Sequence, residues 1–240
     1  MTTDKSAPRT ARARAREELT REIKEAARAQ LAAVGAPSLS LREVARQLGM
    51  ASSALYRYFP SRDDLLTALI IDAYDALGEA GEAADAGCER DDLAGRWLSA
   101  CKAIRAFALA RPNEYALIYG SPVPGYKAPE ATIGPASRLM IVLAAILADA
   151  SAGAEEPPLT VDWAERHPVL HGDFEVIRSL GLFGAGDETI LRGITAWTQV
   201  FGMVSFELFG QFNNVIEDRD GLFERATIAM GEFIGLSADR

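Results

Sequence analysis

Apolar residues recur at helical spacing along nearly the whole of this 240-residue chain. Near the start, Leu19, Ile23, Ala26, Leu31 and Val34 follow the three-and-four spacing that places side chains on one face of an α-helix. The sequence contains no sustained alternation of apolar and polar residues, and no Asn-Gly or Asp-Gly hairpin between such runs. We therefore predict an all-α fold.

Glycine and proline divide the first helical stretches. Residues 35–37 end the first helix, Gly49 ends a short helix over 41–48, and Pro60 stops another over 52–59. Two short helices joined by a glycine turn cannot form a core alone, so they must pack on the helices before and after them. That arrangement is a helix-turn-helix.

Two capping boxes predict where helices begin. Ser40 and Glu43 have the S-x-x-E spacing at the start of the second helix. Ser61 and Asp64 have the related spacing at the start of a long fourth helix that reaches Leu77.

The rest of the chain predicts further helices separated by irregular segments. A polar, glycine-bearing linker is expected from Gly78 to Asp92, and the segment GSPVPGYKAPE, rich in proline and glycine, predicts a structured loop or lid. The later helices are expected at about 93–108, 115–118, 131–150, 187–211 and 223–234.

Charge is distributed unevenly along the chain. The net charge is −9, with +6 over residues 1–62 and −15 over residues 63–240. An acidic whole argues against indiscriminate binding of polyanions, whereas a basic leading quarter suits a localised surface that contacts phosphates.

Metal sites and cofactors are not expected. Cys88 and Cys101 form no CxxC motif, and Pro168 separates His167 from His171 without an HExxH pattern. The sequence also shows no phosphate-binding loop and no GxSxG motif, so we predict that the protein is not an enzyme.

The helix predicted over 52–59 carries residues suited to DNA. With Val44, Leu48, Leu55 and Phe59 facing inward, small hydroxyls, an arginine and tyrosines point outward. Small hydroxyls let a helix enter the major groove, arginine pairs with guanine edges or phosphates, and tyrosine hydroxyls reach phosphates. The outward residues are Ser52, Ser53, Tyr56, Arg57 and Tyr58.

The motif SLREVARQLGMASSALYRYFPSRDDLL resembles the DNA-binding motif of the TetR family of bacterial transcriptional regulators, and the match runs over about residues 18–66. The chain departs from the family pattern at Ala51, where the family usually has serine or threonine, and at Arg62, where it usually has lysine. The resemblance implies DNA contacts by Ser40, Arg42, Tyr56, Tyr58 and Arg62, mainly to phosphates, and by Ser52, Ser53, Ala54 and Arg57 at or near the bases.

The segments RPNEYALIYGSPVPGYKAPE and AWTQVFGMVSFELFGQF resemble signatures of the WHG-type subgroup of these regulators. The basic leading residues predict a disordered arm over 1–16. The motif predicts a helix-turn-helix DNA-binding domain over 17–62, and the resemblance implies a domain for effector binding and dimerisation over 63–240. The 187–211 helix has two small or apolar faces, which independently suggests that one face meets a partner copy.

Two groups of candidate residues follow for that domain, although aromatic residues at helical spacing are also common in cores. Candidates for an apolar effector pocket are Trp97, Cys101, Ile104, Tyr115, Tyr119, Trp163, Phe174, Trp197 and Phe201. Candidates for the dimer interface are Leu191, Thr195, Thr198, Gly202, Ser205, Phe209, Phe223 and Met230.

The leading hypothesis is a homodimeric repressor that a small-molecule effector releases from a palindromic DNA operator. The alternatives are a cytosolic all-helical ligand carrier or enzyme, and a regulator or activator that needs no effector. The longest apolar stretch without charge, residues 139–148, spans roughly 15 Å as a helix against a hydrocarbon layer of about 30 Å. We therefore expect a cytoplasmic protein that does not enter a membrane.

Overall fold

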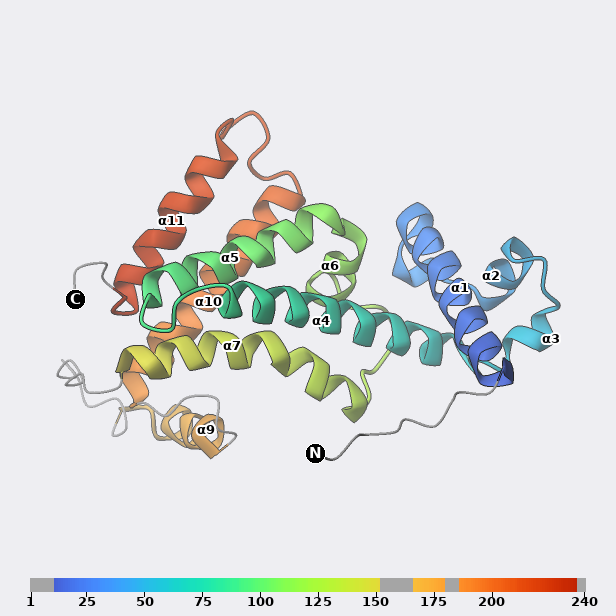
Figure 1. The fold of residues 1–240 in the computed structure, drawn as a ribbon, viewed down its shortest axis with the longest axis horizontal. Coiled ribbons are helices and arrows are strands. Elements are labelled where there is room, and N and C mark those ends of the chain that lie inside the picture. Colours follow the sequence, from blue (N-terminus) through green and yellow to red (C-terminus); the bar gives the residue numbers. More distant parts are fainter. Residues whose placement is uncertain (1–10, 152–165, 180–185, 237–240) are drawn as a thin grey trace, which may run out of the picture. The chain divides into compact units, whose positions relative to one another are not determined.

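The computed structural model describes residues 11–151, 166–179 and 186–236, and within these ranges every regular element is a helix (Figure 1). The all-α prediction is confirmed. The chain divides into two compact units. The first comprises Met1–Ala73 and Asn113–Thr132, and the second comprises Tyr74–Pro112 and Ile133–Arg240.

The first unit contains the predicted helix-turn-helix. Its α1 begins at Ala11, inside the segment that the sequence suggested was an arm, so residues 11–16 are helical. Gly35, with φ of 75°, follows the end of this helix, as predicted. The elements are α1 (Ala11–Val34), η1 (Ala36–Ser38), α2 (Leu41–Gln47), α3 (Ser52–Leu55), the first half of α4 (Arg62–Ala86), most of α6 (Pro112–Tyr119) and η2 (Glu130–Thr132).

Apolar packing holds α2 against α1 and α3 against α2 in the core of the first unit. Ile23 from α1, Val44 from α2, Leu55 from α3 and Leu65 from α4 are each fully buried. Each such side chain stabilises the fold by about 1.5–3 kcal/mol relative to an exposed position. The short helices therefore depend on their long neighbours, as their length predicted.

Polar contacts add to the packing between helices of the first unit. Asp72 of α4 accepts from Lys24 at 2.7 Å and from Arg28 at 2.6 Å, both on α1. The segment 120–129 is irregular, as predicted, and the hydroxyls of Tyr126 and Thr67 are hydrogen-bonded at 2.9 Å. The predicted loop is thus fastened to α4 inside the first unit.

The second unit is built around α5. The buried side of α5 includes Trp97, Cys101 and Ile104, and α5 packs against α7, α10 and α11. These helices span Leu93–Ala110 (α5), Ile133–Ser151 (α7), Pro168–Ser179 (α9), Asp187–Leu208 (α10) and Arg219–Phe233 (α11).

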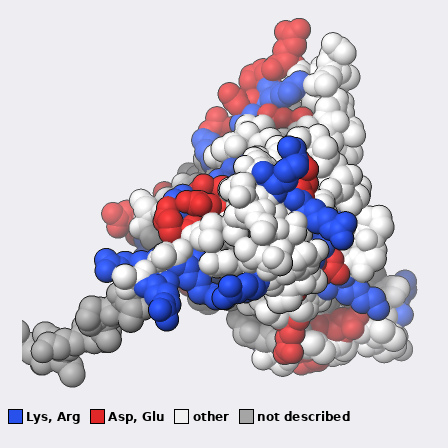
Figure 2. Space-filling model, turned by 90° about the vertical axis from the view of Figure 1, so that its right-hand side faces the viewer, with Lys and Arg blue, Asp and Glu red and all other residues white. Residues whose placement is uncertain are grey.

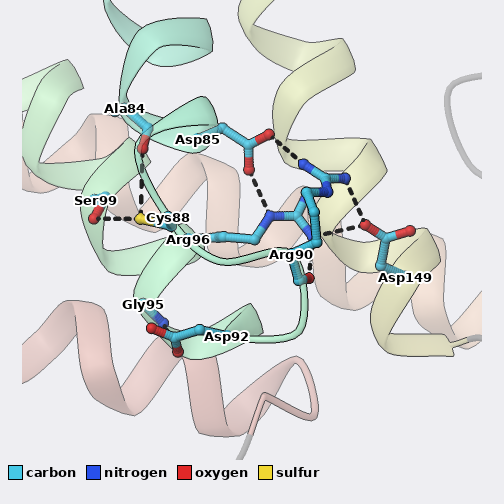
Figure 3. Close-up of polar contacts among 9 residues, drawn as sticks. All are labelled: Ala84, Asp85, Cys88, Arg90, Asp92, Gly95, Arg96, Ser99 and Asp149. Atoms are coloured by element: carbon cyan, nitrogen blue, oxygen red, sulfur yellow. Dashed lines mark hydrogen bonds and ion pairs between the residues drawn. The ribbon is translucent and has the colours of Figure 1, made fainter.

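A fully buried arginine lies at the start of α5. The guanidinium of Arg96 donates to Asp85 of α4 at 2.7 Å and to Asp149 of α7 at 2.7 Å (Figure 3). Arg90 donates to the same two carboxylates, but its side chain is 63% exposed. The cluster therefore joins three helices through one buried charge.

The apolar helix α7 is a core element of the second unit. By length and composition alone the helical stretch Glu130–Ser151 could cross a membrane, and 39% of its most apolar window is buried inside the protein. Core helices of soluble proteins often have this composition. Here Leu139, Leu143 and Ile146 are buried, and α7 packs against α5.

One helix was not expected from the sequence. α9 begins at Pro168. Proline is well tolerated at the first helical position, because an N–H group there would have no acceptor within the helix. His171 Nδ1 lies 2.6 Å from Oδ2 of Asp187, at the start of α10, so the histidine joins two helix segments.

The prediction that α4 ends near Leu77 was wrong, since α4 continues to Ala86. Gly78 and Gly81, in the polar stretch that suggested a break, instead permit α4 and α7 to pack closely. A Cβ atom at Gly78 would lie 2.7 Å from Cβ of Arg138 in α7, and one at Gly81 would lie 2.6 Å from a methyl group of Leu139.

We expect the Gly78→Ala variant to lower the free energy of unfolding by about 1–3 kcal/mol, because α7 must shift away from the added methyl group. Gly172→Ala is the matched control. Gly172 lies within α9 and faces open space, so alanine there should stabilise by up to about 1 kcal/mol. Chemical denaturation measures both changes, and equal effects would contradict the close approach.

Candidate DNA-binding site

The helix-turn-helix has the predicted turn and core. Gly49 adopts φ of 65°, which favours glycine, and the amide of Met50 donates to the carbonyl of Ala45 at 2.9 Å. Val44, Ala45, Leu55 and Phe59 are buried, whereas Leu48 is only half-buried. The turn therefore fixes α3 against α2 and leaves the other face of α3 for contacts.

The recognition segment is less regular than predicted. α3 ends at Leu55, and the amides of Arg57 and Tyr58 donate to carbonyls three residues earlier, as in a 3₁₀-helix. No side chain caps the start of α3, where Ala51 stands. Pro60 limits how far the segment can continue, since proline disfavours helical backbone in the residue before it, here Phe59.

The candidate base-contacting residues lie together on this segment. Ser53, Tyr56 and Arg57 are exposed, while Ser52, Ala54 and Tyr58 are half-buried. In the view onto the side where α1, α2 and α3 lie, Lys and Arg side chains lie on several sides of a largely uncharged central area, with Asp and Glu side chains also at its edges (Figure 2). Such a surface offers both cations for phosphates and small groups for a groove.

Two candidate arginines are available for DNA. Arg57 and Arg42 are exposed, and among the residues that the structure describes neither forms a hydrogen bond or ion pair. Arg46 differs, because its guanidinium donates to Glu43. Those hydrogen bonds hold the pKa of the Glu43 carboxyl below its ordinary value. Arg57 and Arg42 are thus free to meet phosphates or bases.

Arg16 is a functional candidate that the sequence reasoning missed. Its guanidinium lies over the ring of Tyr58, 5.1 Å from the centroid. Such a contact contributes about 0.5–1 kcal/mol at an exposed site. The sequence reasoning placed Arg16 in a disordered arm, and only the helical start of α1 brings it to the recognition segment.

The expected capping box at Ser40 is not formed. Ser40 begins α2 but its hydroxyl makes no capping hydrogen bond, and Glu43 turns to Arg46 instead. The amide of Ser40 donates to Oε1 of the buried Gln30 at 2.7 Å. A tertiary partner therefore takes the place of the local one.

The aromatic effector candidates fall into separate groups. Tyr115 and Tyr119 belong to the first unit, with ring centroids 5.2 Å apart. Trp197 and Phe201 of α10 are in edge contact, with ring centroids 5.9 Å apart, and the buried indole N–H of Trp197 has no partner within the described part of the chain. Trp163 lies outside the described residues.

The candidates on α5 lie on its buried face. Trp97 donates through its indole N–H to the carbonyl of Thr227 at 2.9 Å, and it borders a cavity of about 230 Å³ between α5 and α11. Burial raises the pKa of the Cys101 thiol, so that thiol stays protonated. Ile104 and Phe174 are also buried. This cavity is smaller than the roughly 300–1,000 Å³ of typical ligand pockets.

The candidate dimer residues on α10 and α11 range from exposed to buried. Thr195, Thr198 and Phe209 are exposed, and the half-buried candidates are Leu191, Gly202, Ser205 and Met230. Phe223 is different, because it is buried within the second unit beneath Arg105, whose guanidinium carbon lies 5.3 Å from the ring centroid. The sequence reasoning missed three further exposed apolar residues, namely Phe206, Ile228 and Phe233.

A helix-turn-helix whose exposed Arg42 and Arg57 make no ion pair among the described residues is typical of a DNA-binding protein. Comparison with known proteins agrees. Residues 23–69 match the family described as bacterial regulatory proteins, tetR family, and residues 97–230 match the tetracyclin repressor-like C-terminal domain.

Similar proteins are also regulators. The chain is 39% identical over 216 residues to the HTH-type transcriptional regulators Rv1816 of Mycobacterium tuberculosis and Mb1846 of Mycobacterium bovis, covering 89% of this chain and 91% of each relative. The solved structure of the regulatory protein SCO4313 is 34% identical, with a TM-score of 0.73, and the match covers 92% of this chain and 98% of that one. The chain belongs to the TetR family of DNA-binding transcriptional regulators, which are not enzymes.

Proposed function

We propose that the protein is a homodimeric cytoplasmic repressor that binds a palindromic operator and is released from it by a small apolar effector. Exposed apolar side chains on the last two helices carry the proposal. Phe206, Phe209, Ile228 and Phe233 are between 38% and 52% exposed. Residues of this kind gathered along two helices are suited to burial against a second copy.

A dimer explains how the DNA-binding surface is used. Two recognition segments related by a two-fold axis reach successive major grooves roughly 34 Å apart, and each reads one half of a palindrome. The outer face of each segment supplies Ser53, Tyr56 and Arg57 for its half-site.

Effector release follows if a ligand binds better to a protein conformation that does not fit the operator, because ligand and DNA then weaken each other's binding. Among the described residues the buried indole N–H of Trp197 has no partner, and a ligand with a hydrogen-bond acceptor would satisfy it. This feature supports an effector that carries a carbonyl, hydroxyl or ether oxygen.

Selection of genomic fragments by the purified protein at about 150 mM salt tests the proposal, since nonspecific phosphate contacts are weakened there. We expect a palindromic consensus. Retention without a consensus, or binding that fades uniformly with salt, would contradict a sequence-specific dimer. The genes beside the operator then suggest candidate effectors. Small molecules that bind the proteins encoded by those genes are tested for their ability to release the regulator from its operator.

We expect the Phe209→Asp variant to be monomeric, because a carboxylate would be buried against the second copy. Binding to the full palindrome should fall roughly 100-fold or more, since one half-site contact set is lost. Analytical ultracentrifugation and a shift assay measure the two effects. Val169→Asp, at an exposed apolar residue of α9, is the matched control and should leave a dimer that binds normally. A dimeric Phe209→Asp protein would contradict the proposed interface.

A further inference from the structure

Arg62 occupies the first position of α4, where the family resemblance implies a phosphate contact, yet its side chain is directed toward the protein. Nη2 donates to the carbonyl of Ala36 at 2.8 Å and to that of Pro37 at 3.3 Å, and Nε donates to the carbonyl of Leu39 at 3.2 Å. The guanidinium therefore holds the segment between α1 and α2 against the start of α4.

The donors of Arg62 are largely used by these bonds. A guanidinium has five N–H groups, and a two-point contact to phosphate needs a pair of them on one edge. The Nε and Nη2 edge is occupied by carbonyls, and Nη1 lies 3.4 Å from Asp63. A two-point phosphate contact would require the protein bonds to break.

One of the carbonyls bound by Arg62, that of Leu39, directly precedes Ser40 in the chain. Leu39 is buried and its carbonyl belongs to the peptide bond whose amide is that of Ser40. That same amide donates to Oε1 of the buried Gln30 at 2.7 Å. One peptide group is therefore held at both its oxygen and its nitrogen, by side chains from α4 and α1.

This arrangement leaves the side chain of Ser40 available. Ser40 has extended backbone, with φ of −134° and ψ of 118°, and its hydroxyl forms no hydrogen bond within the described residues. A hydroxyl held in one place loses less conformational freedom when it binds a ligand. The fixed peptide group thus prepares the hydroxyl for an external acceptor.

We propose that Arg62 and Gln30 are positioning residues that fix the Leu39–Ser40 peptide so that the Ser40 hydroxyl meets a DNA phosphate, and that Arg62 does not itself carry a phosphate contact. The inference rests on the proposed function, because it takes Ser40 as a DNA contact. Lysine could not replace Arg62, since a single ammonium lacks the planar fork that reaches several carbonyls.

The test measures affinity for the selected operator, and its salt dependence, for Ser40→Ala, Arg62→Lys, Arg62→Ala, Gln30→Met and the double variants. We expect Ser40→Ala to weaken binding about tenfold, the effect of losing a hydrogen bond to a charged group. Arg62→Lys and Gln30→Met should each weaken it by a similar factor or less, with the slope of log affinity against log salt unchanged.

The double variants separate positioning from direct contact. In a Ser40→Ala background, Arg62→Lys and Gln30→Met should cost little more, because their effect passes through a hydroxyl that is already absent. Arg46→Lys is the matched control for the same exchange at an exposed arginine, and it should bind as the unmodified protein does. Melting curves establish that each variant is folded at the assay temperature.

Three results would overturn the inference: normal affinity of Arg62→Lys, full additivity with Ser40→Ala, or normal affinity of Ser40→Ala. A salt slope that falls by about one for each bound copy in Arg62→Ala would assign Arg62 a phosphate contact and overturn it too. Failure of the unmodified protein to select an operator is a separate outcome that contradicts the proposed function, so the two failures are distinguishable.

Discussion

Replacing Arg57 and Tyr58 together with alanine is expected to abolish sequence-specific DNA binding while the fold remains intact. Arg57 is exposed and has no protein partner among the described residues, so its removal costs the protein no internal contact. A paired arginine–base contact contributes about 1–3 kcal/mol, and a hydrogen bond to a phosphate about 1.5–3 kcal/mol. Specific affinity should therefore fall roughly 100-fold or more.

A shift assay with operator and unrelated duplexes measures this effect. The two contacts are expected to act differently, because Arg57→Ala alone should reduce the preference for operator, whereas Tyr58→Ala alone should weaken binding to every sequence. Tyr58 also packs beneath Arg16, so circular dichroism is needed to show that the fold survives. Arg46→Ala removes an exposed arginine that is already paired with Glu43 and serves as the control. Full retention of operator binding by the double variant would exclude this face as the DNA-binding surface.

Much of the helix-turn-helix could be predicted because its determinants are local. The position of Gly49 marks the turn, and the spacing of Val44, Leu55 and Phe59 marks the buried face, although Leu48, expected on that face, is only half-buried. The helix start at Ser61 was also predicted correctly, since the Ser61 hydroxyl accepts from the amide of Asp64 at 3.1 Å. The reciprocal half of the box differs, because the Asp64 carboxylate accepts from that hydroxyl at 2.7 Å.

Prediction failed where a distant side chain competed with a local pattern. The box at Ser40 was lost because Gln30 binds the Ser40 amide while Arg46 holds Glu43. A helical pattern shows which residues face inward, but it does not show which polar groups meet across helices. The role of Arg62 is hidden for the same reason, since its acceptors lie more than twenty residues earlier in the chain.

The glycines of α4 show a second limit. A glycine in a polar stretch predicts a break, yet Gly78 and Gly81 lie inside a continuous helix. Their use becomes visible only when α7 is placed against them, because added Cβ atoms would meet Arg138 and Leu139. Tertiary packing overrides the weak local preference here, at a cost of roughly 1 kcal/mol for each glycine in a helix.

The spacing of apolar residues also did not predict that Arg96, at the start of α5, is buried. The second large effect is expected from the loss of one of its partners. We expect Asp85→Ala to lower the free energy of unfolding by about 3–5 kcal/mol, because it leaves the fully buried Arg96 with one of its two carboxylates removed. Asp85 is itself mostly buried, so water cannot readily replace it. Chemical denaturation of the purified variant measures the change.

Variants within the same cluster show whether burial of the charge causes the loss. Arg90 binds the same carboxylates as Arg96, but it is largely exposed, so Arg90→Ala should cost no more than about 1 kcal/mol. Adding Arg96→Met to Asp85→Ala removes the stranded charge and should recover part of the lost stability, since a buried ion pair can often be replaced by apolar groups. The contrary result is that Arg96→Met lowers the free energy of unfolding by the same amount with and without Asp85→Ala. The loss of stability in Asp85→Ala would then come from packing and not from an unpaired charge. Recovery would show that Arg96 stabilises these three helices only while its carboxylates are present.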